Sequence, residues 1–151
     1  MSDKRQLFDP TFIVYQIVAV QCFYYLIMGT LWGVIHSIFG FPVTLDNFFT
    51  PNYVNFSTLP GLLESFCMVT SGSLGSYILM NVVERSKKCV DFTVTFFFIH
   101  VILCWMYSQQ FPLVWEWWTM NVSSAVLMAS LGEYLCSKHE LEDIPLYSSS
   151  I

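Results

Sequence analysis

Charged side chains are scarce in this chain of 151 residues: they make up 11% of it, hydrophobic residues make up 55%, and the mean hydropathy is +0.56. A soluble domain of this size normally carries about 25% charged residues. The shortfall indicates that most of the molecular surface faces something other than water. The length suits a single domain.

Positive charge is missing from long stretches of the chain. The formal net charge is -5, which argues against a nucleic-acid partner because phosphate binding needs clustered cations. Membrane proteins keep Lys and Arg in short cytosolic segments, so a chain that crosses a bilayer four times would hold all its cations on one side. The six cations are Lys4, Arg5, Arg85, Lys87, Lys88 and Lys138.

Patterns typical of an enzyme or a metalloprotein are also missing. The sequence contains no nucleophile–base–acid set, no pair of carboxylates at defined spacing and no Walker-type phosphate loop. The five cysteines lack metal-ligand spacing and fall outside the predicted lumenal segments, which favours reduced, buried thiols over a disulfide framework. We therefore expect no catalysis, no cofactor and no metal. The cysteines are Cys22, Cys67, Cys89, Cys104 and Cys136.

Four apolar stretches are long enough to cross a membrane, because about 20 helical residues span about 30 Å of hydrocarbon. We place them at about 12–38, 60–83, 91–108 and 117–136. The first is longer than a crossing needs and should tilt or project; it also exceeds the apolar core of a signal peptide, about 7–15 residues, which is the rival interpretation. Asp91 is the predicted N-cap of the third helix.

These stretches predict an all-α, polytopic membrane protein, with residues 1–151 forming one domain and four helices in an up-down bundle. The three connections between the spans differ in charge. The first connection and residues 108–116 lack Lys and Arg and should be lumenal, whereas the loop 84–90 and both termini should be cytosolic. The tail 137–151 is acidic, and from Lys138 onward we expect it to be extended. Asn55-Phe56-Ser57 is a glycosylation sequon too close to the second span to be used.

Aromatic residues gather where a headgroup interface is expected, close to the last connection. They are Trp105, Tyr107, Trp115, Trp117 and Trp118.

Small residues recur at helical spacing in three of the spans, and such residues let backbones approach closely in a membrane. A homodimer interface is one interpretation, and packing within one bundle is the one we favour. The sets are Gly29 with Gly33, Gly72 with Ser76, Ser71 with Gly75, and the stripe Asn121, Ala125, Ala129, Gly132.

Four polar residues lie inside the predicted spans: Glu64, His100, Asn121 and Glu133. Glu64 and Glu133 lie about one helical turn from a span end, so each can reach the interface or a neighbouring donor. Only His100 and Asn121 approach the middle of the bilayer. A proton pathway would need several titratable groups in line, so structural hydrogen bonds are favoured over transport.

The cytosolic boundary carries the remaining candidates. Arg85, Lys87 and Lys88 can contact anionic lipids, although the positive-inside rule alone accounts for them. Cys89 and Cys136 are candidates for palmitoylation, and an unmodified thiol is the favoured alternative.

Several specific motifs follow one another in the second half of the chain: the run from Lys88 to Thr95, then His100, the run from Cys104 to Ser108, Phe111-Pro112, Trp117-Trp118 and the run from Gly132 to Cys136. Taken together with these motifs, the segments resemble the Sys family of integral membrane trafficking proteins of the Golgi, over nearly the whole chain. Phe8 stands before the Asp-Pro pair where the family usually has Trp, which changes an interfacial anchor.

The resemblance implies a trans-Golgi receptor for an Arf-related small GTPase, which leads to a second Arf-like GTPase and to golgin tethers. It also implies a partner whose N-terminus is acetylated and uncharged. We hypothesise that this terminus enters a groove between helices at the cytosolic boundary. The partner-binding residues would be Gly132, Glu133 and Tyr134, with the basic loop of Arg85, Lys87 and Lys88 orienting the partner. The alternatives are a small transporter or channel subunit and a structural membrane scaffold that forms oligomers.

Overall fold

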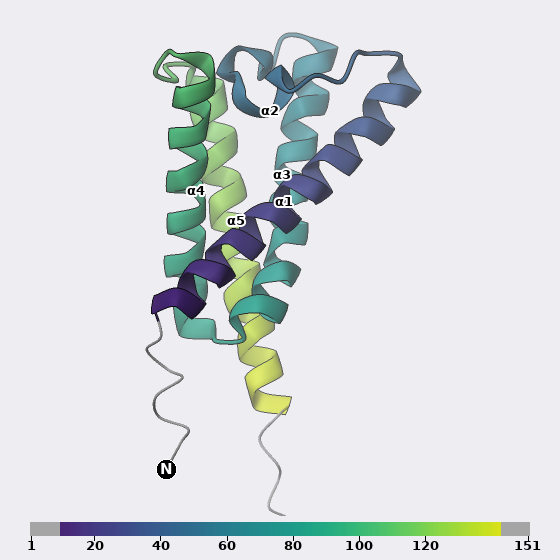
Figure 1. Ribbon diagram of the computed structural model, residues 1–151. Helices are drawn as coiled ribbons and strands as arrows, with labels where there is room; N and C mark the ends of the chain where they lie inside the picture. The colour runs from purple at the N-terminus through teal and green to yellow at the C-terminus, as the bar shows by residue number, and fades with distance from the viewer. Residues whose placement is uncertain (1–9, 143–151) are drawn as a thin grey trace, which may run out of the picture.

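The computed structural model describes residues 10–142, and in that range the chain forms helices joined by short connections (Figure 1). The long helices are α1 (Pro10–Phe39), α3 (Leu59–Val83), α4 (Ser86–Ser108) and α5 (Trp115–Glu142). A four-residue helix, α2 (Asp46–Phe49), and the 3-10 turn η2 (Pro51–Tyr53) lie between α1 and α3. The predicted all-α fold is therefore confirmed for the part of the chain that the structure describes.

The start of α4 differs from the prediction. The helix begins at Ser86, with Arg85 as its N-cap, and Asp91 is an exposed residue inside it. The predicted N-cap at Asp91 was wrong because the chain breaks earlier: Glu84 takes a left-handed conformation with φ 56° and ends α3. Only these two residues, Glu84 and Arg85, separate the two helices.

The end of α5 also differs from the prediction. The helix continues to Glu142, so the first part of the tail predicted to be extended is helical. Residues 143–151 lie outside the described residues, as do Lys4 and Arg5.

Helix α1 crosses the other long helices diagonally (Figure 1). Its 30 residues make a helix of about 45 Å at 1.5 Å per residue, longer than an apolar core requires. Residues four apart lie on one helix face, and α1 buries a single line of them against its neighbours. The line consists of Val20, Tyr24, Met28, Trp32 and His36.

Helices α3 and α5 approach each other closely through small residues. A Cβ atom at Gly72 would lie 2.9 Å from the backbone oxygen of Ser124, and one at Gly75 would lie 3.1 Å from Sδ of Met128. The Ser124 hydroxyl donates a hydrogen bond of 3.0 Å to the backbone oxygen of Met68. The glycines of α3 therefore serve packing within one chain, which is the interpretation we favoured.

The outside of the helix assembly is apolar on every long helix. Large exposed side chains include Leu26 of α1, Phe66 of α3, Phe98 of α4 and Val126 of α5. A helix that is hydrophobic on both its buried and its outer face suits a membrane. By length and composition, α1, α3 and α4 can cross a bilayer, whereas α5 is less apolar.

Candidate functional site

The basic loop joins α3 to α4 at the end of the molecule where α5 also ends (Figure 1). The side chain of Glu140 accepts two hydrogen bonds from Ser86, at 3.2 Å from its backbone nitrogen and at 2.9 Å from its hydroxyl. Arg85 provides no side-chain cap for α4. Glu140 of α5 instead accepts the hydrogen bond of a backbone N–H in the first turn of α4, which would otherwise have no partner within the helix. This contact links the loop to the last turns of α5 and accounts for the helical start of the predicted tail.

Gly132 lies in the interior at this end of the molecule. A Cβ atom there would be 3.1 Å from Cδ1 of Leu79 on α3 and 3.8 Å from Cβ of Cys89 on α4. The room that Gly132 provides is therefore filled by the chain's own side chains. The sequence indicated that Gly132 leaves room for a close approach, but not which side chains would occupy that room.

The other predicted partner-binding residues lie on the surface in two separate groups. Arg85 and Lys87 are exposed at the start of α4, and Lys88 beside them is half-buried. Glu133 and Tyr134 are exposed on α5, and Tyr134 is 65% accessible. Gly132 is buried against α3 and α4, so it does not share a surface with Glu133 and Tyr134.

The thiols of Cys89 and Cys136 face each other across α4 and α5, with 3.1 Å between their sulfur atoms. Both residues are fully buried, so neither offers the accessible thiol that palmitoylation requires. Cys67 and Cys104 are buried as well, whereas Cys22 is exposed, contrary to the expectation of buried thiols throughout. Within residues 10–142, no three His, Cys, Asp or Glu side chains are placed to hold a metal ion.

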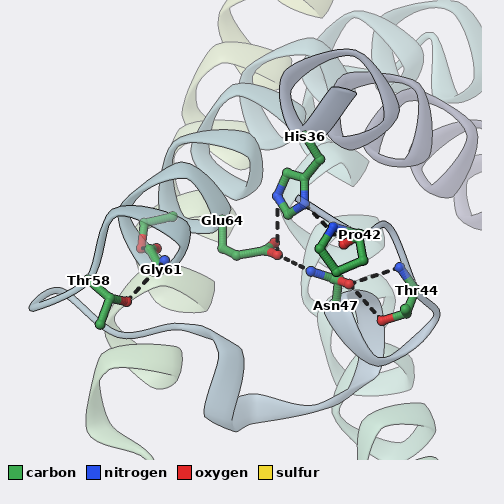
Figure 2. A network of polar contacts seen from close by, with 8 residues as sticks. His36, Pro42, Thr44, Asn47, Thr58, Gly61 and Glu64 are labelled. Carbon is green, nitrogen blue, oxygen red and sulfur yellow. Dashed lines mark hydrogen bonds and ion pairs between the residues drawn. The ribbon is translucent and has the colours of Figure 1, made fainter. Parts of the chain in front are cut away.

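A buried polar network lies at the opposite end, where α1 ends and α3 begins (Figure 2). Glu64 is 1% exposed and accepts a hydrogen bond from the side-chain amide of Asn47. His36 approaches the same carboxyl oxygen, with 3.5 Å between Nε2 and Oε1. Asn47 in turn accepts from the backbone nitrogen and the hydroxyl of Thr44, at 3.0 Å and 2.8 Å.

The network links three parts of the chain: the end of α1, the helix α2 and the start of α3. Glu64 was expected to find a neighbouring donor, and Asn47 is that donor. His36 was missed as its partner, although the line of buried residues spaced by four along α1 ends at His36 and could have indicated it.

His100 and Asn121, the polar residues predicted near mid-membrane, both contact Trp117. Nδ1 of His100 lies 2.7 Å from the hydroxyl of Tyr25, and its ring stacks on Trp117 with centroids 6.1 Å apart. Asn121 donates to the backbone oxygen of Trp117 at 2.9 Å. These contacts fit structural hydrogen bonding. Trp117 is buried and so is not part of the predicted interfacial belt, whereas Trp115 is 64% exposed.

The apolar exterior, the long helices and the gathering of the described cations at one end define a helical integral membrane protein. A family model described as "Integral membrane protein S linking to the trans Golgi network" matches residues 3–146. The chain belongs to this SYS1 family, and is a multi-pass membrane protein of the trans-Golgi network.

Relatives within the family match almost the whole chain. The Protein SYS1 homolog of Dictyostelium discoideum is 36% identical over 146 residues, which are 97% of this chain and 62% of that protein. The homolog of Nematostella vectensis is 33% identical over 147 residues, 97% of this chain and 93% of the relative. Protein SYS1 of Saccharomyces cerevisiae (strain ATCC 204508 / S288c) is 26% identical over 141 residues, 93% of this chain and 69% of the yeast protein. This chain thus spans less than two thirds of the Dictyostelium protein. No solved structure matches this chain.

Proposed function

We propose that this chain is a four-span receptor that recruits an Arf-related small GTPase to the cytosolic face of the trans-Golgi, supporting golgin recruitment and traffic from endosomes. The observation that carries the proposal is the gathering of basic residues at one end of a membrane protein of this family. Arg85, Lys87 and Lys88 lie beside the last turns of α5, which carry Lys138. By the positive-inside rule this end faces the cytosol, where a GTPase would dock.

The crossing of the membrane by α5 is supported by its contacts along its whole length. Near its start, Trp115 contacts Phe56 in the connection before α3, with ring centroids 5.6 Å apart. Near its end, Glu140 binds Ser86 at the start of α4. Contacts with α3 and α4 at both ends of the helix support a position for α5 at the same depth in the membrane.

The modest hydropathy of α5 fits a position inside a bundle. Asn121 and Ser124 are buried against neighbouring helices, whereas Val122 and Val126 are 56% and 57% exposed. These two polar side chains thus face protein while the two valines face outward, as is usual for intramembrane polar residues and their apolar neighbours.

The four-span arrangement predicts that both chain ends are cytosolic. Epitopes at the two termini should be stained in cells whose plasma membrane alone is permeabilised, because the Golgi membrane then stays closed. An epitope inserted after Gly40, in the connection between α1 and α2, serves as the control and should be stained only after full permeabilisation. Staining of either terminus only under full permeabilisation would contradict the topology.

The recruiting surface is expected to be the exposed part of the basic loop together with Glu133 and Tyr134. Reversing two charges, with Arg85→Glu and Lys87→Glu, should slow association of the GTP-loaded GTPase with proteoliposomes by about tenfold at low salt, because such charges steer encounter. Both side chains are exposed, so the fold should tolerate the change.

The matched control is Arg85→Lys with Lys87→Arg, which keeps both charges and should keep the rate. The association rate is measured with the GTPase in its GTP-loaded and GDP-loaded forms. An unchanged rate in the charge-reversed variant would remove the loop from the recruiting surface. Equal association of the two nucleotide states would favour the structural scaffold.

A further inference from the structure

A small groove opens between α1 and the first turns of α4, with a volume of about 220 Å³. Its floor is apolar, whereas one edge carries a lysine, an aspartate and a threonine. The residues that line it are Ile13, Ile17, Lys88, Asp91, Phe92 and Thr95.

Farther along the two helices, side chains link α1 to α4. Gln21 donates to the backbone oxygen of Phe96 at 3.2 Å, and the hydroxyl of Tyr25 lies 2.7 Å from His100. Before these contacts, Gln16 turns to α3 and donates to Val82 at 2.6 Å. The groove lies nearer the starts of α1 and α4 than these contacts, beside Ile13 and Ile17.

The charges at the edge of the groove have opposite sign and lie one helical turn apart. Lys88 and Asp91 are at positions i and i+3 of α4, so both point to the same side of the helix. Within residues 10–142, neither takes part in a salt bridge. Lys88 is half-buried, in contrast to the exposed Lys87 beside it, because its side chain turns toward the groove.

A cation and a carboxylate one turn apart, above an apolar floor, complement a molecule with a phosphate, a nearby ammonium and a hydrocarbon chain. The groove also lies near an end of two helices that are apolar enough to cross a bilayer, where lipid headgroups are found. A primary ammonium donates hydrogen bonds to a carboxylate, which a quaternary ammonium cannot do.

From this geometry we infer that the groove binds a bilayer phospholipid with a primary ammonium headgroup, phosphatidylethanolamine. Lys88 binds its phosphate, Asp91 binds its ammonium, and one acyl chain lies along Ile13, Ile17 and Phe92. The basic triplet is then divided: Arg85 and Lys87 face the cytosol, and Lys88 faces a lipid. The topology proposed above determines which leaflet supplies the lipid, and the rest of the inference does not depend on that topology.

The test measures lipids retained by the full chain after extraction from bilayers with equal amounts of phosphatidylethanolamine, phosphatidylserine and phosphatidylcholine that share the same acyl chains. Native mass spectrometry of the detergent-solubilised protein should show phosphatidylethanolamine enriched over phosphatidylcholine by about twofold to fivefold, the range that one solvent-exposed charge pair provides. Phosphatidylserine should fall below phosphatidylethanolamine, because its additional carboxylate is repelled by Asp91.

Two variants separate the roles of the charges. Asp91→Asn should remove the preference for phosphatidylethanolamine while lipid is still retained, and Lys88→Gln should lower retention of all three lipids. The matched controls are Lys87→Gln and Glu84→Gln, exposed neighbours that do not line the groove. They should leave both the amount and the preference unchanged.

Equal retention of phosphatidylethanolamine and phosphatidylcholine by the unaltered chain would overturn the inference, as would a preference that survives Asp91→Asn. Both results would also leave the groove open to a different occupant, such as the apolar terminus of a protein partner. The measurement uses solubilised protein without a GTPase. Absence of a lipid preference would therefore leave the proposed receptor function untouched, and loss of GTPase recruitment would leave the lipid inference untouched.

Discussion

Replacing Gly72 by alanine is expected to force α3 and α5 apart and to destabilise the protein more than the same change at Gly75 or Gly33. The new Cβ would overlap the side-chain oxygen of Ser124 and would lie 2.9 Å from its backbone oxygen and 3.2 Å from its Cα. Backbone atoms of a packed helix cannot rotate away as a side chain can. Overpacking of this kind costs about 1–3 kcal/mol, and more where the backbone itself must move.

Two other glycines provide graded controls for Gly72→Ala. At Gly75 the new Cβ would meet the flexible end of Met128 at 3.1 Å, so Gly75→Ala should cost less. At Gly33 nothing lies within 4 Å, so Gly33→Ala should stabilise α1 by roughly 0.8–1 kcal/mol, the difference in helix propensity.

Thermal unfolding in detergent, followed by size-exclusion chromatography, ranks the three variants. The expected order of stability is Gly33→Ala, then Gly75→Ala, then Gly72→Ala. If Gly72→Ala were as stable as Gly33→Ala, the close approach of α3 and α5 would be wrong.

Composition was sufficient to predict the long helices, because few sequences outside membranes combine so many apolar residues with so few charges. The bounds of α1 and α3, Pro10–Phe39 and Leu59–Val83, lie close to the predicted spans 12–38 and 60–83. The start of α4 was predicted wrongly because capping was assigned to a local side chain at Asp91. In the structure the first turn of α4 is satisfied by Glu140, which lies 54 positions away from Ser86.

At the basic end of the molecule, too, the local sequence did not predict which distant residues come into contact. The sequence predicts that Gly132 leaves room, but which side chain takes that room depends on how three helices pack, and Leu79 takes it. Likewise, Cys89 and Cys136 were predicted as separate thiols at the boundary, and only the register of α4 against α5 brings them together. Residue type predicts which positions can pack closely, whereas partners distant in the chain follow from the tertiary arrangement.

Glu64→Leu is expected to destabilise the protein by about 1–3 kcal/mol, the cost of leaving a buried hydrogen-bond donor without its partner. Glu64 and His36 are 1% and 2% exposed, and Asn47 is 8% exposed. With the carboxyl group gone, the amide of Asn47 and the ring of His36 would stay buried without their partner. The helix α2 would then lose the hydrogen bond that links Asn47 to α3 (Figure 2).

Glu64→Gln separates hydrogen bonding from charge. It keeps an oxygen that can accept from Asn47, so its cost should be smaller than that of Glu64→Leu. Glu133→Leu is the matched control, because this glutamate is exposed on α5 and its loss should change stability by no more than about 0.5 kcal/mol.

A double-mutant cycle of Glu64→Leu with Asn47→Ala measures the coupling directly. Residues in one hydrogen-bond network show interaction energies of about 0.5–3 kcal/mol, so the double variant should be less destabilised than the sum of the two single variants. The free energy of unfolding is obtained for each variant from denaturant titration in mixed micelles. Strict additivity would mean that Asn47 and Glu64 do not support each other, and that the end of α1 is positioned by the packing of Trp32 against Phe48 instead.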